Sequence, residues 1–152
     1  YKTKGMVPQG RYTVPIGQAH IARSGTDITI VATSIMVHKS LAAAEELAAS
    51  GISAEVIDLR TIRPIDRDTI LASVEKTSRL ICVYEAVKTL GIGAEISAMV
   101  AESHAFDFLD APIMRLGGSE NPIPYNPELE KASVPQIADI IKNVTNLVKG
   151  KT

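Results

Sequence analysis

Short apolar runs rich in β-branched residues alternate along this chain with segments of helical periodicity, and this alternation constrains the fold most. Four such runs predict strands, over residues 27–33 (DITIVAT), 54–59, 80–84 and 113–116. The apolar residues between them recur at helical spacing and predict helices over residues 36–50, 66–77, 93–104 and after Pro135. Alternation of this kind implies βαβ crossovers. We therefore predict a three-layer α/β/α fold with a mostly parallel sheet of about five strands.

The boundaries of these elements also have sequence signals. Ser34 is a candidate N-cap of the first helix, Gly51 stands where a C′ glycine belongs, and Asp66 is a candidate cap of the second helix. A short run over residues 16–23 predicts one more strand, which could lie antiparallel at an edge. Residues 117–133 are rich in glycine and proline and predict a long irregular excursion.

The domain organisation follows from the same pattern. Glycine and proline break any period over residues 1–15, which we interpret as an N-terminal linker, and residues 16–150 predict a single domain. The chain opens with Tyr1 and not with methionine, so we expect a piece of a longer protein.

Composition removes several classes of function. The chain has 152 residues, with 16 Lys and Arg against 17 Asp and Glu, so it lacks the basic excess of a nucleic-acid-binding domain. No apolar run is long enough to span a bilayer, and no signal peptide precedes the domain, so we expect neither a nucleic acid nor a membrane as partner. The single cysteine, Cys82, excludes an intrachain disulfide and favours a reducing compartment.

Local clusters that could carry chemistry are missing from the sequence. His20, His38 and His104 lie far apart, and Cys82 stands in the middle of a predicted strand, where a thiol is a small buried group. The glycines of residues 91–95 (GIGAE) lack the third glycine of a dinucleotide fingerprint, so a tight turn explains them better. We therefore predict no catalytic, cofactor-binding or metal-binding residue in this chain. Such a domain more often positions other parts than performs chemistry itself.

One alternative is a phosphate- or nucleotide-binding module. Ser34 at a helix N-terminus, helped by Arg60 or Arg63, could hold a phosphate at the carboxyl ends of the strands. In the simpler interpretation, Ser34 caps the helix and the arginines pair with Asp58 or Asp66.

Several motifs spread over nearly the whole chain are distinctive when taken together. They are residues 14–19 (VPIGQA) with 25–31 (GTDITIV), 54–66 (AEVIDLRTIRPID), 92–96 (IGAEI), 110–117 (DAPIMRLG), and 122–125 (PIPY) with Leu129-Glu130 and Val134-Pro135. In order and spacing they resemble the transketolase C-terminal domain. The resemblance is nearest to the beta subunit of the thiamine-diphosphate-dependent decarboxylating component of 2-oxo acid dehydrogenase complexes, of the pyruvate, branched-chain or acetoin type. The C-terminal domain of a transketolase or a deoxyxylulose-phosphate synthase is the related alternative.

The resemblance implies a division of labour. In such enzymes an upstream pyrimidine-binding domain, together with the alpha subunit, encloses thiamine diphosphate and Mg²⁺. That upstream domain is absent from these residues, so the resemblance implies that this fragment binds neither and is inactive alone. The C-terminal domain joins subunits in an alpha2beta2 tetramer and docks the subunit-binding domain of the acyltransferase core. The whole enzyme decarboxylates a 2-oxo acid oxidatively and transfers the acyl group to lipoamide, in the bacterial cytoplasm or the mitochondrial matrix.

The resemblance also assigns a docking site. Asp110, at the head of the Asp-Ala-Pro motif, matches an acidic position that holds the basic subunit-binding domain, and Asp107 and Glu102 could extend the negative patch. Alternatively, Asp110 only begins the turn before Pro112. Residues 84–90 (YEAVKTL) differ from several relatives, which leaves the 2-oxo acid open.

Overall fold

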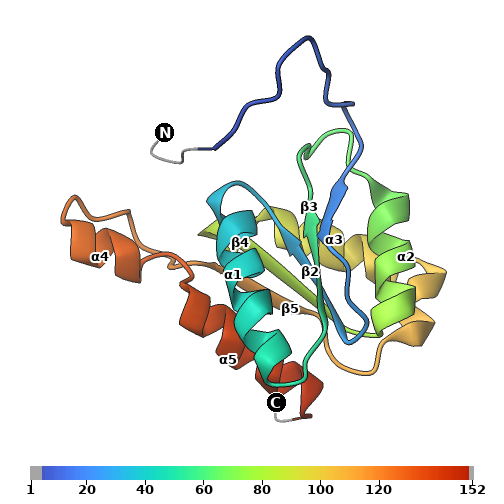
Figure 1. Ribbon diagram of the computed structural model, residues 1–152. Helices are drawn as coiled ribbons and strands as arrows, with labels where there is room; N and C mark the ends of the chain where they lie inside the picture. Colours follow the sequence, from blue (N-terminus) through green and yellow to red (C-terminus); the bar gives the residue numbers. More distant parts are fainter. Residues whose placement is uncertain (1–4, 151–152) are drawn as a thin grey trace.

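A five-stranded mixed sheet organises the computed structural model, which describes residues 5–150. In chain order the strands are β1 (His20–Arg23), β2 (Ile28–Ala32), β3 (Ala54–Asp58), β4 (Leu80–Val87) and β5 (Met114–Gly118). Their order across the sheet is β1-β3-β2-β4-β5. Strands β2 to β5 are parallel, and β1 pairs antiparallel with β3 at one edge, with His20 opposite Asp58. The predicted fold class, including the antiparallel edge strand, is confirmed (Figure 1).

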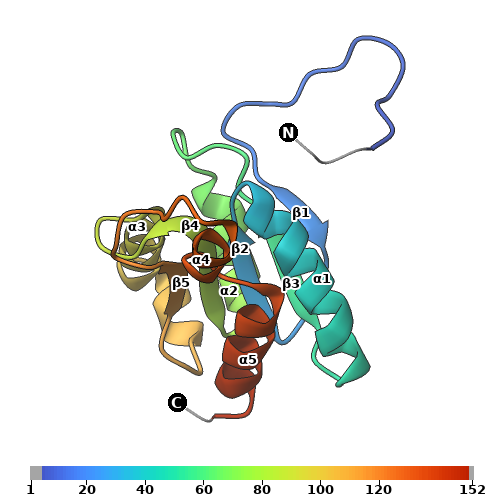
Figure 2. The same ribbon diagram turned by 90° about the vertical axis from the view of Figure 1, so that its left-hand side faces the viewer.

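Helices cover both faces of this sheet. They are α1 (Ile35–Ala49), α2 (Arg67–Thr77), α3 (Ile92–Ala101), the 3₁₀ helix η1 (His104–Phe108), α4 (Pro127–Ala132) and α5 (Ile137–Val148). Apolar residues of α1 and α5 pack with Ile30 of β2 in one core, whereas residues of α2 and α3 pack with Val31 of β2 in the other. Figure 2 shows α1 and α5 beside each other on one side of the sheet. Every residue of β2 is buried because alternate side chains enter the two cores.

The described residues that precede β1 reach the domain at the carboxyl ends of the parallel strands. Because β1 is antiparallel, it begins beside the end of β3. The Gly17 N–H donates to Thr61 Oγ1 at 3.0 Å, and the Ala19 N–H donates to Asp66 Oδ2 at 2.8 Å. Residues 5–15 of the predicted linker contain neither helix nor strand, and residues 1–4 lie outside the described range.

Two of the predicted boundaries are wrong. Ser34 precedes α1 as expected, but its φ is 54° and its side chain makes no capping hydrogen bond. Residues 117–133 are not wholly irregular, because α4 begins at Pro127 behind an Asn126 cap. The predicted cap at Asp66 is confirmed, since its carboxylate accepts from the Thr69 N–H.

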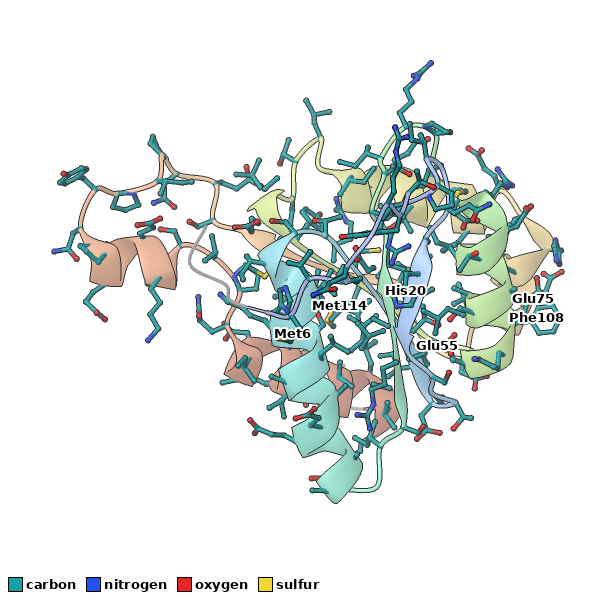
Figure 3. All side chains as sticks on the ribbon, turned by 45° about the horizontal axis from the view of Figure 1, so that its top comes forward. Met6, His20, Glu55, Glu75, Phe108 and Met114 are labelled. Carbon is teal, nitrogen blue, oxygen red and sulfur yellow. The ribbon has the colours of Figure 1, made fainter. Side chains whose placement is uncertain are left out.

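A charged side chain lies inside the sheet layer. Glu55 of β3 is fully buried and forms an ion pair with Lys76 of α2. Its carboxylate also accepts from Ser73 Oγ at 2.5 Å and from the Gly25 N–H at 3.2 Å. Burial alone would raise the pKa of Glu55, but the hydrogen bonds from Lys76, Ser73 and Gly25 outweigh it and hold this pKa below its ordinary value. Figure 3 shows the Glu55 side chain on the side of the sheet that α2, the helix of Lys76, covers.

Candidate docking site

The three acidic residues predicted to dock a partner follow one another around the end of α3. Glu102 is the C-cap of α3, Asp107 lies in η1, and Asp110 follows η1 before β5. All three are exposed, with 61% of the Asp110 side chain open to solvent. Three carboxylates are therefore available to a partner from one short stretch of chain.

Asp110 is held in place by the turn that follows α2. Its backbone N–H donates to the Ser78 carbonyl at 2.8 Å, and its Oδ2 lies 3.4 Å from Nη2 of Arg79. Arg79 is only 24% exposed and also donates to the Asp27 carbonyl at 3.3 Å. These contacts hold Asp110 against the turn after α2, and its carboxylate is still accessible. Because Ser78 and Arg79 directly precede β4, Asp110 lies at the amino ends of the parallel strands.

An apolar groove lies beside these carboxylates. It has a volume of about 610 Å³, and Phe106, Leu109 and Ile113 line it together with Asp107. Phe106 is 55% exposed and Phe108 is 47% exposed, although both are large aromatic side chains. The sequence analysis missed these two residues. The signal was the stretch Phe106-Asp107-Phe108, in which aromatic and acidic residues alternate within a chain that has few aromatic residues.

The 3₁₀ helix is capped locally and joined to α2. Ser103 Oγ accepts from the Ala105 N–H at 3.3 Å at the start of η1, and His104 Nε2 lies 2.6 Å from Glu75 Oε1 of α2. Figure 3 shows Glu75 and Phe108 at the same rim of the molecule. The groove and its acidic edge therefore have a defined position on the domain.

The residues of the predicted alternative, a phosphate site, lie at the carboxyl ends of the strands. Arg60 Nε lies 3.9 Å from Asp58 Oδ2, which is the pairing expected in the simpler interpretation. Ser34 makes no capping hydrogen bond at the α1 N-terminus, so the other half of the simpler interpretation, a Ser34 cap, is wrong. Among residues 5–150, no cluster of His, Cys, Asp and Glu side chains could hold a metal ion.

The glycine-rich turn before α3 serves packing. A Cβ atom on Gly93 would overlap the Tyr84 ring and stand 2.8 Å from its hydroxyl oxygen. A Cβ on Gly91 would lie 2.8 Å from Cε2 of the same ring, and one on Gly117 would lie 3.0 Å from it. Tyr84 is 2% exposed, so these glycines make room for a buried aromatic ring.

Cys82 is the buried apolar thiol that the strand pattern predicts. It belongs to the core between the sheet and α2, and burial raises its pKa to about 12. A thiol of this kind is not a nucleophile near neutral pH.

Comparison with known proteins gives this domain a family. Residues 17–140 match the family described as the C-terminal domain of transketolase. The chain belongs to this family. A chain of a split-gene transketolase, reported as an inactive beta4 tetramer, has the same fold. The two structures superpose with a TM-score of 0.77 at 26% sequence identity. The matched region covers 97% of this chain and 46% of the split-gene transketolase chain.

The relatives in sequence are beta subunits. The pyruvate dehydrogenase E1 component subunit beta of Dictyostelium discoideum mitochondria is 54% identical over 130 residues, which cover 86% of this chain and 36% of the relative. The beta subunit of an acetoin:2,6-dichlorophenolindophenol oxidoreductase from Cupriavidus necator is 44% identical over 150 residues, or 99% of this chain and 44% of the relative. The resemblance inferred from the motifs is confirmed. This chain spans less than half the length of either relative.

Relatives named as mitochondrial and a relative from a bacterium both occur in this group. Within residues 5–150, no helix has the length and apolar character that crossing a bilayer requires.

Proposed function

We propose that this domain assembles and docks the parts of a thiamine-dependent 2-oxo acid dehydrogenase, as the C-terminal domain of its beta subunit. The whole enzyme would decarboxylate a 2-oxo acid and pass the acyl group to lipoamide. An alpha subunit and a second beta subunit complete the alpha2beta2 tetramer, in the mitochondrial matrix or a bacterial cytoplasm. High identity to two kinds of beta subunit supports this assignment.

The proposal gives this chain no part in the thiamine chemistry. Thiamine diphosphate and Mg²⁺ belong to an upstream pyrimidine-binding domain and the alpha subunit. Within this scheme, residues 1–15 are the linker from that domain and residues 16–150 are the docking and assembly domain.

The observation that carries the docking role is the exposed carboxylate of Asp110 beside an apolar groove. A cationic side chain of the acyltransferase's subunit-binding domain would contact Asp110, with Asp107 and Glu102 adding negative charge around it. Arg79 is the internal competitor, but a pair between Asp110 and Arg79 in which the carboxylate is 61% exposed is weak. Apolar residues of the partner would cover Phe106 and Leu109 and exclude water from the charge pair.

Calorimetric titration of the assembled alpha2beta2 enzyme with the subunit-binding domain tests this proposal. Asp110→Asn keeps a residue that favours the turn and removes the charge. Truncating one side of an interfacial charge pair costs about 2–5 kcal/mol, which is at least a tenfold loss of affinity. The melting temperature should stay within about 2 °C, because an exposed ion pair adds little stability.

Glu45→Gln on the exposed face of α1 is the matched control and should bind like the parent enzyme. Affinity of the parent should fall with salt, because the Debye length shortens from about 10 Å at 0.1 M to about 3 Å at 1 M. Unchanged affinity of Asp110→Asn would remove Asp110 from the docking site.

A further inference from the structure

Exposed apolar side chains gather at the carboxyl ends of the parallel strands. Ile35 follows β2, Ile62 follows β3, Leu90 follows β4 and Ile123 follows β5, and all four are exposed. Leu90 is 98% exposed and Ile123 is 69% exposed. At the amino ends of the parallel strands, the turns over residues 24–27, 50–53 and 78–79 carry no large exposed apolar side chain, and the exposed Phe106 and Phe108 lie in η1 beside the candidate docking site. Exposed apolar side chains gathered at one edge mark a surface that another protein segment covers.

The stretch over residues 119–132, which we call the arm, extends this surface. Its helix α4 has no buried side chain, Tyr125 is fully exposed and Leu129 is 57% exposed. Figure 1 shows α4 standing away from the sheet and from the helices that cover it. A helix of six residues is not stable through its own hydrogen bonds, so its apolar side chains indicate a missing packing partner.

The arm nevertheless has a defined conformation. Asn126 Oδ1 accepts from the Glu128 N–H at 2.9 Å, and the Ser119 N–H donates to the Ser133 carbonyl at 2.9 Å. Glu120 Oε1 accepts from the N–H and the hydroxyl of Thr89, at 3.1 Å each, and so joins the arm to the turn that holds Leu90. The arm and this turn therefore present their apolar side chains as one unit.

The backbone conformation and the exposure of Leu90 also indicate that another segment covers this surface. Its φ of 58° is in the left-handed region, where a leucine is strained and asparagine or glycine is preferred. Its side chain is 98% exposed, so no side-chain packing within residues 5–150 offsets this strain. A strained residue persists where its surroundings hold it in place, and an apolar contact from outside this domain would do so for the Leu90 side chain.

The path of the chain indicates what covers the surface. The residues before β1 arrive at this same edge, where Gly17 and Ala19 donate to Thr61 and Asp66. The family is a C-terminal domain, and this chain spans 36% to 44% of the length of the two beta subunits described above. A large part of such a protein therefore precedes this domain and is delivered to the edge that carries the exposed apolar residues.

We propose that the carboxyl edge of the sheet and the arm form the surface on which the preceding part of the same polypeptide packs. This inference rests on the proposed function, because it takes this domain as the end of a longer beta subunit. Leu90, Ile123 and Tyr125 are its central contacts, and the facing surface is apolar where it meets them. The edge at which open α/β sheets commonly bind ligands is then closed by protein.

Thiol accessibility in the full-length beta polypeptide tests the proposal. Leu90→Cys and Tyr125→Cys place thiols on the proposed interface, and Ser24→Cys places the control thiol in an exposed turn at the opposite edge. The native Cys82 thiol gives no background, because it is buried and its pKa is about 12. Labelling by a maleimide, followed peptide by peptide with mass spectrometry, should be at least tenfold slower at positions 90 and 125 than at position 24. Ile123→Cys replaces either interface variant if its circular dichroism shows that it has not folded.

Equal labelling rates at both edges would overturn the proposal. Protection that develops only after the alpha subunit is added would also overturn it, because the cover would then be the other subunit. The same preparations, assayed with the alpha subunit for 2-oxo acid decarboxylation, separate this inference from the proposed function. Slow labelling at positions 90 and 125 without decarboxylation activity supports this interface and refutes the proposed function. Fast labelling at these positions with full decarboxylation activity refutes this interface and supports the proposed function.

Discussion

Replacing Glu55 by glutamine should destabilise this domain by about 2–4 kcal/mol, because the buried carboxylate accepts from three groups at once. Lys76, Ser73 and the Gly25 N–H all aim donors at Glu55, whose side chain is 1% exposed. A glutamine of the same shape loses the charge and directs an N–H₂ group toward those donors. Each hydrogen bond to a charged group is worth about 1.5–3 kcal/mol.

The cost stays below that of a fully buried pair, about 3–5 kcal/mol, because Lys76 can regain water. Its side chain is 44% exposed, so the ammonium is not stranded when Glu55 is neutralised. Urea unfolding of Glu55→Gln, followed by circular dichroism, measures the loss directly. For a chain of this size the same loss lowers the melting temperature by roughly 5–15 °C.

The pH dependence distinguishes the charge from simple packing. The pKa of Glu55 is lower in the folded chain than its ordinary value of 4.5, so the folded state binds the proton less readily than the unfolded state. This stabilisation is fully present above the unfolded pKa and is lost as the pH falls through the lower folded pKa. The gap in unfolding free energy between parent and variant should therefore be constant near neutrality and shrink below about pH 4.

Glu45→Gln, an exposed change on α1, should unfold like the parent at every pH. A Glu55→Gln variant within about 0.5 kcal/mol of the parent would refute the assigned role of this ion pair, since that is the range of ordinary surface substitutions. A gap that does not change down to pH 3 would show that shape, and not charge, sets the stability.

Two further substitutions test local features of the fold. Asp66→Ala removes both the α2 cap and the acceptor of the Ala19 N–H, so urea unfolding should show a loss of about 1–3 kcal/mol, whereas Asp68→Ala in the same helical turn should cost less than about 1 kcal/mol. Gly93→Ala pushes a methyl group into the Tyr84 ring and should cost about 1–3 kcal/mol, whereas Gly5→Ala, with open space around it, should leave the melting temperature unchanged.

The sequence predicted the sheet because burial on two faces leaves a local signature. Residues 28–32 are all buried and nearly all apolar, as a strand between two layers of helices requires. Asp66 was predictable for a similar reason, since a helix cap contacts the N–H three residues ahead. Local chemistry of this kind does not depend on the rest of the fold.

Ser34 shows where that reasoning fails. It has the residue type and the position of a cap, but its φ in the turn between β2 and α1 is 54°, and its side chain makes no capping hydrogen bond. For α4 the error is the opposite, because a helix forms where an irregular segment was predicted. Asn126-Pro127 is a good helix start, but the other prolines of residues 117–133 outweighed this signal in the prediction. In both cases the surrounding chain, and not the local residues, decides the conformation.

The polar core and the docking groove were beyond the reach of the sequence pattern. Lys76, Ser73 and Gly25 lie 21, 18 and 30 residues from Glu55, so no spacing reveals their contact. The acidic residues came from a motif, whereas the groove beside them arises only when η1 folds against α2 and α3. Sequence thus predicted the charged part of the candidate site and missed its apolar part.

The two surfaces proposed for this domain lie at opposite ends of its parallel strands, so binding at one surface should not affect the other. Asp110 is tied to Ser78 and Arg79 at the amino ends of the strands, whereas Leu90 and the arm lie beyond the carboxyl ends. A partner bound at Asp110 would therefore stay clear of the part of the enzyme packed against Leu90. Distant sites without shared partners contribute additively, within about 0.5 kcal/mol. The effect of Asp110→Asn on docking should consequently be the same whether or not Tyr125 is replaced, because the rigid parallel strands separate the two surfaces.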